Sequence, residues 1–185
     1  MTEKIFTRNF HLADSHTLPR YRETGGYTAL PTALGMEPAA ITEEIKKANL
    51  RGLGGAAFPA GVKWGFIPKA STDPKYLVIN ADEGEPGTFK DRYLMERDPH
   101  ALVEGMVIAA RAIGSHLGFV YIRGEYVKPW RILDGAVKEA YEAGLLGKNI
   151  QGSGFDFDIV IHRGDRKSTR LNSSHSRASR MPSSA

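Results

Sequence analysis

The chain has 185 residues, of which 41% are hydrophobic and 25% charged, a composition typical of globular proteins rather than disordered, fibrous or membrane-spanning ones. Its net charge of +4 comes from residues 165–185, because the rest of the chain holds equal numbers of cations and anions, and this neutrality argues against nucleic-acid binding. The absence of cysteine excludes disulfides and any iron–sulfur cluster held by cysteines of this chain.

The first third of the chain contains few regular patterns. Residues 1–37 are rich in turn formers and lack sustained periodicity, so we predict an extended arm that lies on the main domain, without a secretion signal. From Pro38, apolar residues at near-helical spacing predict a helix over residues 38–49. A glycine-dense loop follows at residues 51–64, and Pro59 permits a helix to start inside it.

The rest of the chain alternates between strand-like and helix-like patterns. Short runs rich in apolar and β-branched residues predict strands at residues 75–80, 117–124 and 155–162. Helical spacing lies between them, from about residue 90, over 99–113 with Gly114 as C-cap, and over 127–144. The most apolar helix is too short to cross a bilayer, so we expect no membrane insertion. The alternation predicts an α/β fold with a parallel sheet, whose ligands lie beyond the carboxyl ends of the strands.

The first candidate site is the glycine-dense loop, GLGGAAFPAGVKW at residues 52–64. Closely spaced glycines let backbone amides approach a phosphate, and a helix starting near Pro59 adds a positive dipole end. Lys63 can neutralise a phosphate, and Phe58 and Phe66 offer faces to an aromatic ring. The loop lacks the Gly-Lys-Ser/Thr of a P-loop. A tight structural turn, with both phenylalanines in the core, remains the alternative.

The second candidate site is the acidic turn, NADEGEPGTFKDR at residues 80–92. Its first six residues supply four acceptors, Asn80, Asp82, Glu83 and Glu85, just past the end of a strand. Carboxylates suit sugar hydroxyls, and an amide suits the donor and acceptor edge of a flavin ring. We therefore expect this turn and the glycine loop to face one crevice, with the turn at the sugar and ring and the loop at the phosphates. A solvated acidic turn and a divalent-metal site are the alternatives.

Two further features carry weaker signals. The tetrapeptide RGEY at residues 123–126 places a cation and an anion after the second strand, where ion pairing between them is the favoured interpretation. The histidines, including His100 and His162, show no metal-ligand spacing and are interpreted as structural or surface residues. Residues 165–185 hold seven serines and five cations, and resemble translated adapter or vector sequence, so we expect a disordered, non-native tail.

The glycine loop, the acidic turn and RGEY occur in a highly specific order and spacing. Together they resemble the NADH-binding flavoprotein subunit of respiratory complex I, the 51-kilodalton or F subunit, over about residues 21–164. That family shows GRGGAGFPTGLKW and NADE-x-EPGTFKDR, followed by segments like RGEY, EAGLLGKNI and GTGFDF, which this chain matches in order. The resemblance implies a Rossmann-like parallel sheet with flanking helices that binds FMN with NADH stacked upon it.

The resemblance also implies roles for individual positions. In that family the glycine loop and its lysine cradle FMN and the dinucleotide, two aromatic residues stack on the adenine, and the acidic turn contacts the flavin and approaches the nicotinamide. Carried over to this sequence, the loop positions are Gly52, Gly54, Gly55, Gly61 and Lys63, the adenine positions are Phe58 and Phe66, the flavin positions are Asn80, Asp82 and Glu83, and the nicotinamide position is Glu85.

The chain departs from the family in the loop and after Gly164. Leu53 stands where the family has Arg, Ala57 where it has Gly, and Ala60 where it has Thr or Ser, which removes a cation, backbone freedom and a hydroxyl. After Gly164 the family continues through a segment that completes the flavin pocket, then a ubiquitin-like domain and a cysteine-rich bundle that holds a four-iron four-sulfur cluster. We therefore expect a truncated protein, with an N-terminal arm and helix (1–50), a partial FMN- and NADH-binding domain (51–164) and the tail.

The implied function is hydride transfer from NADH to FMN, with the intact protein passing electrons through iron–sulfur clusters to quinone. Because the cofactor carries this chemistry, we assign no residue as catalytic acid or base and none as a metal ligand. The implied partners are other peripheral-arm subunits, especially the small thioredoxin-like iron–sulfur subunit, in the cytoplasm at the periphery of the inner membrane. Two alternatives remain: a diaphorase subunit of an NAD-linked hydrogenase or formate dehydrogenase, and a catalytically inactive nucleotide-binding fragment.

Overall fold

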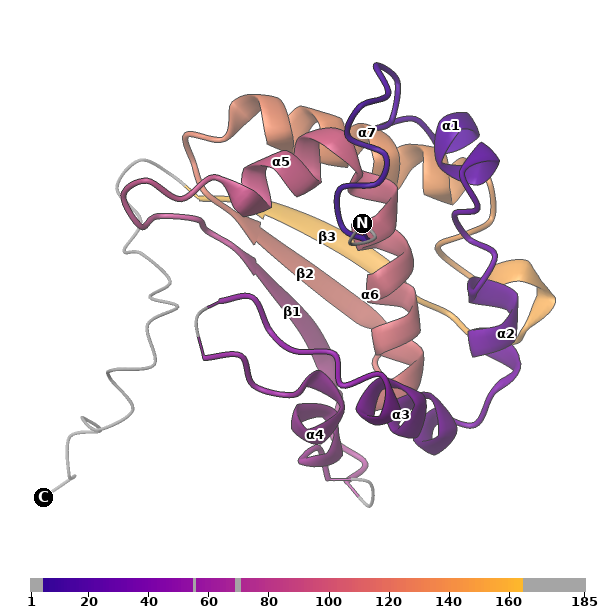
Figure 1. Cartoon of the computed structure of the whole chain (residues 1–185). Helices are drawn as coiled ribbons and strands as arrows, with labels where there is room; N and C mark the ends of the chain where they lie inside the picture. Colours follow the sequence, from indigo (N-terminus) through magenta and orange to yellow (C-terminus); the bar gives the residue numbers. More distant parts are fainter. Residues whose placement is uncertain (1–4, 55, 69–70, 165–185) are drawn as a thin grey trace, which may run out of the picture.

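A computed structural model describes residues 5–54, 56–68 and 71–164, so the predicted tail at 165–185 lies outside the described residues. The elements, in chain order, are α1 (Leu18–Glu23), α2 (Leu30–Gly35), α3 (Pro38–Lys47), α4 (Ala60–Gly65), β1 (Tyr76–Ala81), α5 (Lys90–Arg97), α6 (Pro99–Ile113), β2 (Leu117–Ile122), α7 (Val127–Glu142), the 3-10 turn η1 (Ile150–Gly152) and β3 (Asp158–Arg163). Figure 1 shows the helices gathered around a small sheet.

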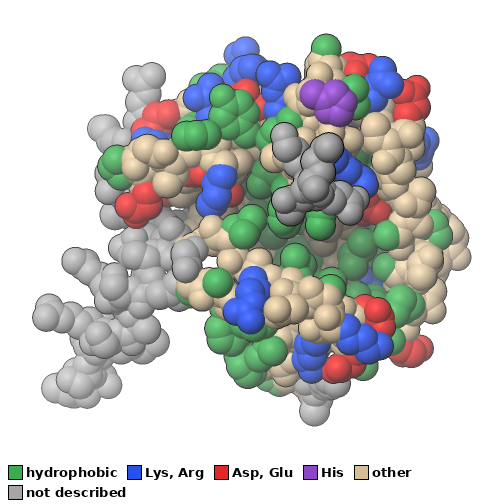
Figure 2. Space-filling model, in the orientation of Figure 1, with side chains coloured by type: hydrophobic (Ala, Val, Ile, Leu, Met, Phe, Trp, Pro, Cys, Tyr) green, Lys and Arg blue, Asp and Glu red, His purple; other side chains and the backbone are tan. Residues whose placement is uncertain are grey.

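The three strands form one parallel sheet in the order β1, β2, β3, which confirms the predicted α/β class. Val78 lies opposite Phe119, and Phe119 lies opposite Val160, so these three side chains share one face of the sheet. Tyr76 and Val78 are 56% and 62% exposed, whereas Val120 and Ile122, on the opposite face, are fully buried. The sheet therefore has one face covered by helices and one face that is largely bare. Figure 2 shows hydrophobic side chains in the recess at the centre of its view.

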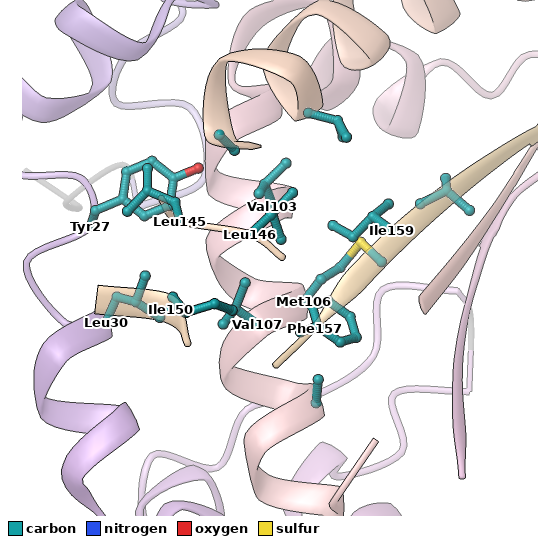
Figure 3. Packing of buried hydrophobic residues seen from close by; sticks show 14 of the residues in the cluster. Tyr27, Leu30, Val103, Met106, Val107, Leu145, Leu146, Ile150, Phe157 and Ile159 are labelled. Atoms are coloured by element: carbon teal, nitrogen blue, oxygen red, sulfur yellow. The ribbon is translucent and has the colours of Figure 1, made fainter. Parts of the chain in front are cut away.

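Buried residues of α6 organise the core on the covered face. Val103 lies beside Leu145 and Leu146, Val107 lies on the side of Leu30 and Ile150, and Met106 lies beside Phe157, which precedes β3 (Figure 3). The sequence explains where α6 begins and ends. Its first residue is Pro99, a residue favoured in the first turn, and its C-cap is Gly114 in the left-handed conformation, with a φ of 71°. Among the residues that the structure describes, no helix is long and apolar enough to span a membrane.

The N-terminal arm differs from the extended segment predicted from the sequence. It contains two helices of six residues each, α1 and α2, and each has proline in its first turn. Leu18, Tyr21 and Leu30 are buried in the same cluster as residues of α6 and the sheet. Local periodicity is weak here because the helices are too short to show it, and tertiary burial stabilises them instead.

The third strand also begins later than predicted. Phe155 and Phe157 alternate with polar residues and are buried, but they lie in a loop before β3. Phe157 exchanges backbone hydrogen bonds of 2.8 and 2.9 Å with Gly147, and the carbonyl of Phe155 accepts from the amide of Ile150. Alternating burial therefore extends beyond the sheet because this loop pairs with the segment that follows α7.

Candidate functional site

A cleft of about 490 Å³ brings the two main sequence motifs together beyond the carboxyl end of β1. Leu53 and Gly54 line it from the glycine loop. The acidic turn contributes Asn80, Asp82, Glu83, Gly84, Glu85, Thr88, Lys90 and Asp91. The expected common crevice is present in the structure, at the strand end where parallel sheets place their ligands. Gly55 lies outside the described residues.

The glycine loop is a hairpin that extends its tip to the cleft. The amide of Gly52 donates to the carbonyl of Phe58 at 3.0 Å, and the amide of Ala60 donates to the carbonyl of Leu50 at 2.8 Å. These bonds close the base of the loop and leave Leu53 and Gly54 at the cleft wall. Ala57 has a φ of 50°, in the left-handed region, where the family has glycine because a Cβ is strained there.

Two other positions of the loop motif do not reach this cleft. Gly61 is buried in α4, where an added Cβ would lie 2.6 Å from Cγ and 2.8 Å from the backbone nitrogen of Lys46 in α3. This glycine is therefore required for close packing of α4 against α3. Lys63 is exposed on α4 and is not among the residues that line the cleft. α4 has only six residues, so the helix dipole expected near Pro59 is small.

Phe58 and Phe66 form an exposed aromatic pair. Their ring centroids are 6.1 Å apart with planes inclined by 48°, and the residues are 44% and 69% exposed. The alternative that these residues belong to the core is therefore wrong. Two solvent-facing rings beside each other provide a surface on which a planar base can stack.

The acidic turn keeps most of its acceptors open to the cleft. The Oδ1 of Asn80 accepts a hydrogen bond from the backbone amide of Asp82 at 3.0 Å, which leaves the NH2 group of the Asn80 side chain as a donor. Glu85 is exposed, and its carbonyl accepts from the backbone amide and the hydroxyl of Thr88, at 3.1 and 2.6 Å. Over residues 5–54, 56–68 and 71–164, no group of three or more histidine, aspartate or glutamate side chains is arranged to hold a metal ion.

Glu83 differs from its neighbours because its carboxylate is turned into the protein. The residue is 6% exposed, and its two oxygens accept the amides of Asp91 and Arg92, at 3.0 and 3.1 Å. These amides belong to the first turn of α5, whose own N-cap residue, Phe89, has no side chain that can accept them. Glu83 therefore caps α5 from a distance, a role that the sequence signals only through the lack of a capping residue at 89.

The RGEY motif contacts the acidic turn, which sequence reasoning missed. Arg123 pairs with Glu125 at 3.0 Å, which confirms the predicted ion pair, and its Nη1 also donates to the carbonyl of Glu83 at 2.8 Å. The hydroxyl of Tyr126 donates to the Glu83 carboxylate at 3.2 Å. Burial, with help from the Glu83 charge, raises the pKa of Tyr126, so its phenol stays protonated and remains a donor.

Comparison with known proteins identifies the family of the chain. Residues 45–170 match the family model of the Nuo51 FMN-binding domain. The chain is 56% identical to the F subunit, number 2, of NADH-quinone oxidoreductase of Rhizobium meliloti over 165 residues, which are 89% of this chain and 39% of that protein. It is 51% identical to the F subunit of NADH-quinone oxidoreductase of Aquifex aeolicus over 149 residues, 80% of this chain and 35% of that protein.

A solved structure shows the same architecture. The crystal structure of an NAD+-reducing [NiFe]-hydrogenase in the H2-reduced state superimposes with a TM-score of 0.65 and 36% identity, and the match covers 80% of this chain and 25% of that chain. The chain thus spans about two fifths of the length of the curated relatives it matches. The resemblance seen in the motifs is confirmed, and the chain belongs to the family of the Nuo51 FMN-binding domain.

Proposed function

We propose that this chain is the part of an NADH-quinone oxidoreductase flavoprotein subunit that binds FMN and presents it to NADH. One observation carries the proposal: the glycine loop and the acidic turn, which are separated in sequence, line the same cleft. A flavin bound there would accept hydride from NADH, and the protein would supply binding and orientation.

The residues of the cleft suit the ring and sugar of a flavin nucleotide. Asp82 and Glu85 offer carboxylates to the ribityl or ribose hydroxyls, and Asn80 offers an amide to the polar edge of the ring. We assign Glu85 to the nicotinamide side because the family motif has a carboxylate at this position, and Glu85 is exposed. The pair Phe58 and Phe66 is the proposed stacking surface for the adenine of NADH.

The phosphate end of the site is the weaker part of this chain. Lys90 lines the cleft, but it pairs with Asp91 at 2.7 Å, and Lys63 lies outside the lining. Leu53 is 58% exposed at the cleft wall, at the position where the family carries arginine. The amide of Gly52 is already bonded to Phe58, so we expect the backbone of the loop at Gly54 to approach the phosphate, without help from a cation at residue 53.

In the intact enzyme, electrons from the flavin would pass to iron–sulfur clusters. This chain has no cysteine, so a four-iron four-sulfur cluster must be held by a part of the protein beyond it. The relatives are named as subunits, and we propose the small thioredoxin-like iron–sulfur subunit of the peripheral arm as the neighbour. The corresponding location is the cytoplasmic periphery of the inner membrane.

A diaphorase subunit is the second candidate function. The structural likeness to an NAD+-reducing hydrogenase favours it, because such an enzyme also passes electrons between a nicotinamide and metal centres. The identity to the two F subunits of NADH-quinone oxidoreductases, 56% and 51%, exceeds the 36% identity to the hydrogenase chain, so the quinone-linked function is the first choice.

The proposal is tested by titrating the full chain with FMN and following the quenching of flavin fluorescence. We expect saturable binding, and NADH-dependent reduction of ferricyanide that requires added FMN. A protein that binds FMN without reducing ferricyanide would be an inactive nucleotide-binding fragment. A protein that binds no FMN would exclude the proposal.

Replacing Leu53 with arginine provides a test that is specific for the phosphate. A charge-assisted bond from this position should strengthen FMN binding by about tenfold and leave binding of riboflavin, which has no phosphate, unchanged. Leu50→Arg is the matched control, because Leu50 is also exposed, at 40%, but does not line the cleft. Equal gains from the two variants would indicate a general charge effect and not a phosphate contact.

A further inference from the structure

The acidic turn is held from the neighbouring strand by two side chains of the RGEY motif. Arg123 follows the carboxyl end of β2, and its Nη1 donates to the carbonyl of Glu83 at 2.8 Å. The hydroxyl of Tyr126 reaches the carboxylate of the same residue at 3.2 Å. The guanidinium carbon of Arg123 lies 5.7 Å from the ring centroid of Tyr126, so the two groups also contact each other.

Glu83 is bonded both to the first turn of α5 and to Arg123. Its carboxylate fixes the first turn of α5 through the amides of Asp91 and Arg92, and its carbonyl is fixed by Arg123. Glu83 lies between Asp82 and Glu85 in the wall of the cleft. A backbone anchored at this residue limits the conformations of both neighbours, which lowers the entropy that a ligand would otherwise remove on binding.

We propose that Arg123 and Tyr126 are positioning residues that hold the acidic turn in the conformation that receives the flavin, through Glu83 and without contacting the ligand. This inference rests on the proposed function for the identity of the ligand, but the anchoring of the turn is a property of the free protein. It assigns the Glu83 carboxylate to the capping of α5 and to Tyr126, and leaves ligand contacts to Asn80, Asp82 and Glu85.

The variants that test the proposal are chosen to spare the core. Tyr126 packs against the hydrophobic core, so Tyr126→Phe keeps the ring and removes only the hydroxyl. Arg123→Ala removes the bond to Glu83, and Arg123→Lys retains a cation that can donate to the same carbonyl. Glu125→Ala is the matched control, because it removes the ion-pair partner of Arg123 and leaves the bond to Glu83 in place.

Two measurements on the full chain keep the inference separate from the proposed function. Hydrogen exchange at the amides of Asp91 and Arg92, without FMN, reports the anchoring of the turn, and FMN titration reports its effect on binding. In Tyr126→Phe and Arg123→Ala we expect exchange at these amides to accelerate about tenfold, and FMN affinity to fall about three- to tenfold. The midpoint of thermal unfolding should stay close to that of the unmodified chain.

Recovery in Arg123→Lys and no effect of Glu125→Ala would support the positioning role. Unchanged exchange at Asp91 and Arg92, or equal effects of Glu125→Ala and Arg123→Ala, would overturn it. An unmodified chain that binds no FMN would overturn the proposed function alone, since the exchange measurement still decides whether Arg123 and Tyr126 anchor the turn.

Discussion

The molecule contains two groups of carboxylates in opposite settings, one beneath the N-terminal arm and one in the cleft. Beneath the arm, Glu104 is buried and accepts the hydroxyl of Tyr21 at 2.6 Å and the amide of Tyr27 at 2.9 Å. The Tyr27 hydroxyl bonds to Nδ1 of His100 at 3.0 Å, and Nε2 of His100 lies 3.2 Å from Glu139. In the cleft, the Glu85 side chain faces solvent.

This difference separates polar groups that stabilise the fold from polar groups available to a ligand. A buried carboxylate with two protein donors contributes to stability, because removing it leaves those donors unpaired. An exposed carboxylate at a strand end contributes little to stability, so its placement there requires another reason. Glu83 belongs to the first class although it lies among residues of the second.

Replacing Glu104, which belongs to the buried group beneath the arm, with alanine should cause the largest loss of stability. The change leaves the Tyr21 hydroxyl and the Tyr27 amide without their acceptor in a buried site, so the free energy of unfolding should fall by about 3 kcal/mol. Chemical denaturation measures the loss. Glu142→Ala, at an exposed position near the end of α7, is the control, and a loss of the same size there would remove the distinction between the two settings.

The pH dependence of stability should be dominated by His100 near neutrality. Burial lowers the pKa of His100 below its usual 6.5, although Glu139 opposes the shift, while Arg22 and His16 add to it. The unfolded chain therefore binds the proton more readily, so the stability from neutral His100 is present above pH 6.5 and is lost as the pH falls below it. The slope approaches about 1.4 kcal/mol per pH unit for one proton.

Chemical denaturation at several pH values between about 7.5 and about 5 measures this slope. Burial raises the pKa of Asp98, and this shift acts in the opposite direction, because the folded chain then binds that proton more readily than the unfolded chain. His100→Gln should flatten the profile near neutrality. An unchanged slope in His100→Gln would show that another group is responsible.

The sequence predicted the sheet well because its signals are local. The strands near 76, 117 and 158 have β-branched apolar runs bounded by turn formers, and α6 has a proline at its start and a glycine at its end. The acidic turn was expected at a ligand site because it follows the carboxyl end of β1. The glycine loop, which precedes β1, was expected beside it because the two motifs suit the phosphate end and the sugar and ring end of one ligand. These features depend on short stretches of sequence or on general rules of chain geometry.

The features that sequence reasoning missed depend on contacts between distant residues. The helices α1 and α2 are stabilised by burial against α6, and the Glu83 carboxylate is oriented by amides eight and nine residues later. The bond from Arg123 to Glu83 spans 40 residues. Gly61 appeared as a phosphate position because it lies in a glycine-rich motif, but the close approach of Lys46 gives it a packing role.

Within the cleft region, Ala57→Gly should produce a small gain in stability. Ala57 adopts a φ of 50°, and relief of that strain is partly offset by the greater freedom of glycine in the unfolded chain, which leaves a net gain of about 0.5 kcal/mol. Ala60→Gly, at the first position of α4, is the control and should lower stability. A loss of stability in both variants would mean that the backbone at residue 57 is unstrained. The hairpin tip would then hold no more strain than the buried group beneath the arm.

Glu85→Ala should have the smallest effect on stability, within about 0.5 kcal/mol of zero by denaturation. The backbone of Glu85 retains its bonds from Thr88, and its side chain shares the cleft with the carboxylates of Asp82 and Asp91, so its removal lowers repulsion between like charges. A loss as large as that of Glu104→Ala would mean that the acidic turn is a structural element like the group beneath the arm. If stability is retained and flavin affinity falls, these carboxylates are placed at the strand end for a ligand.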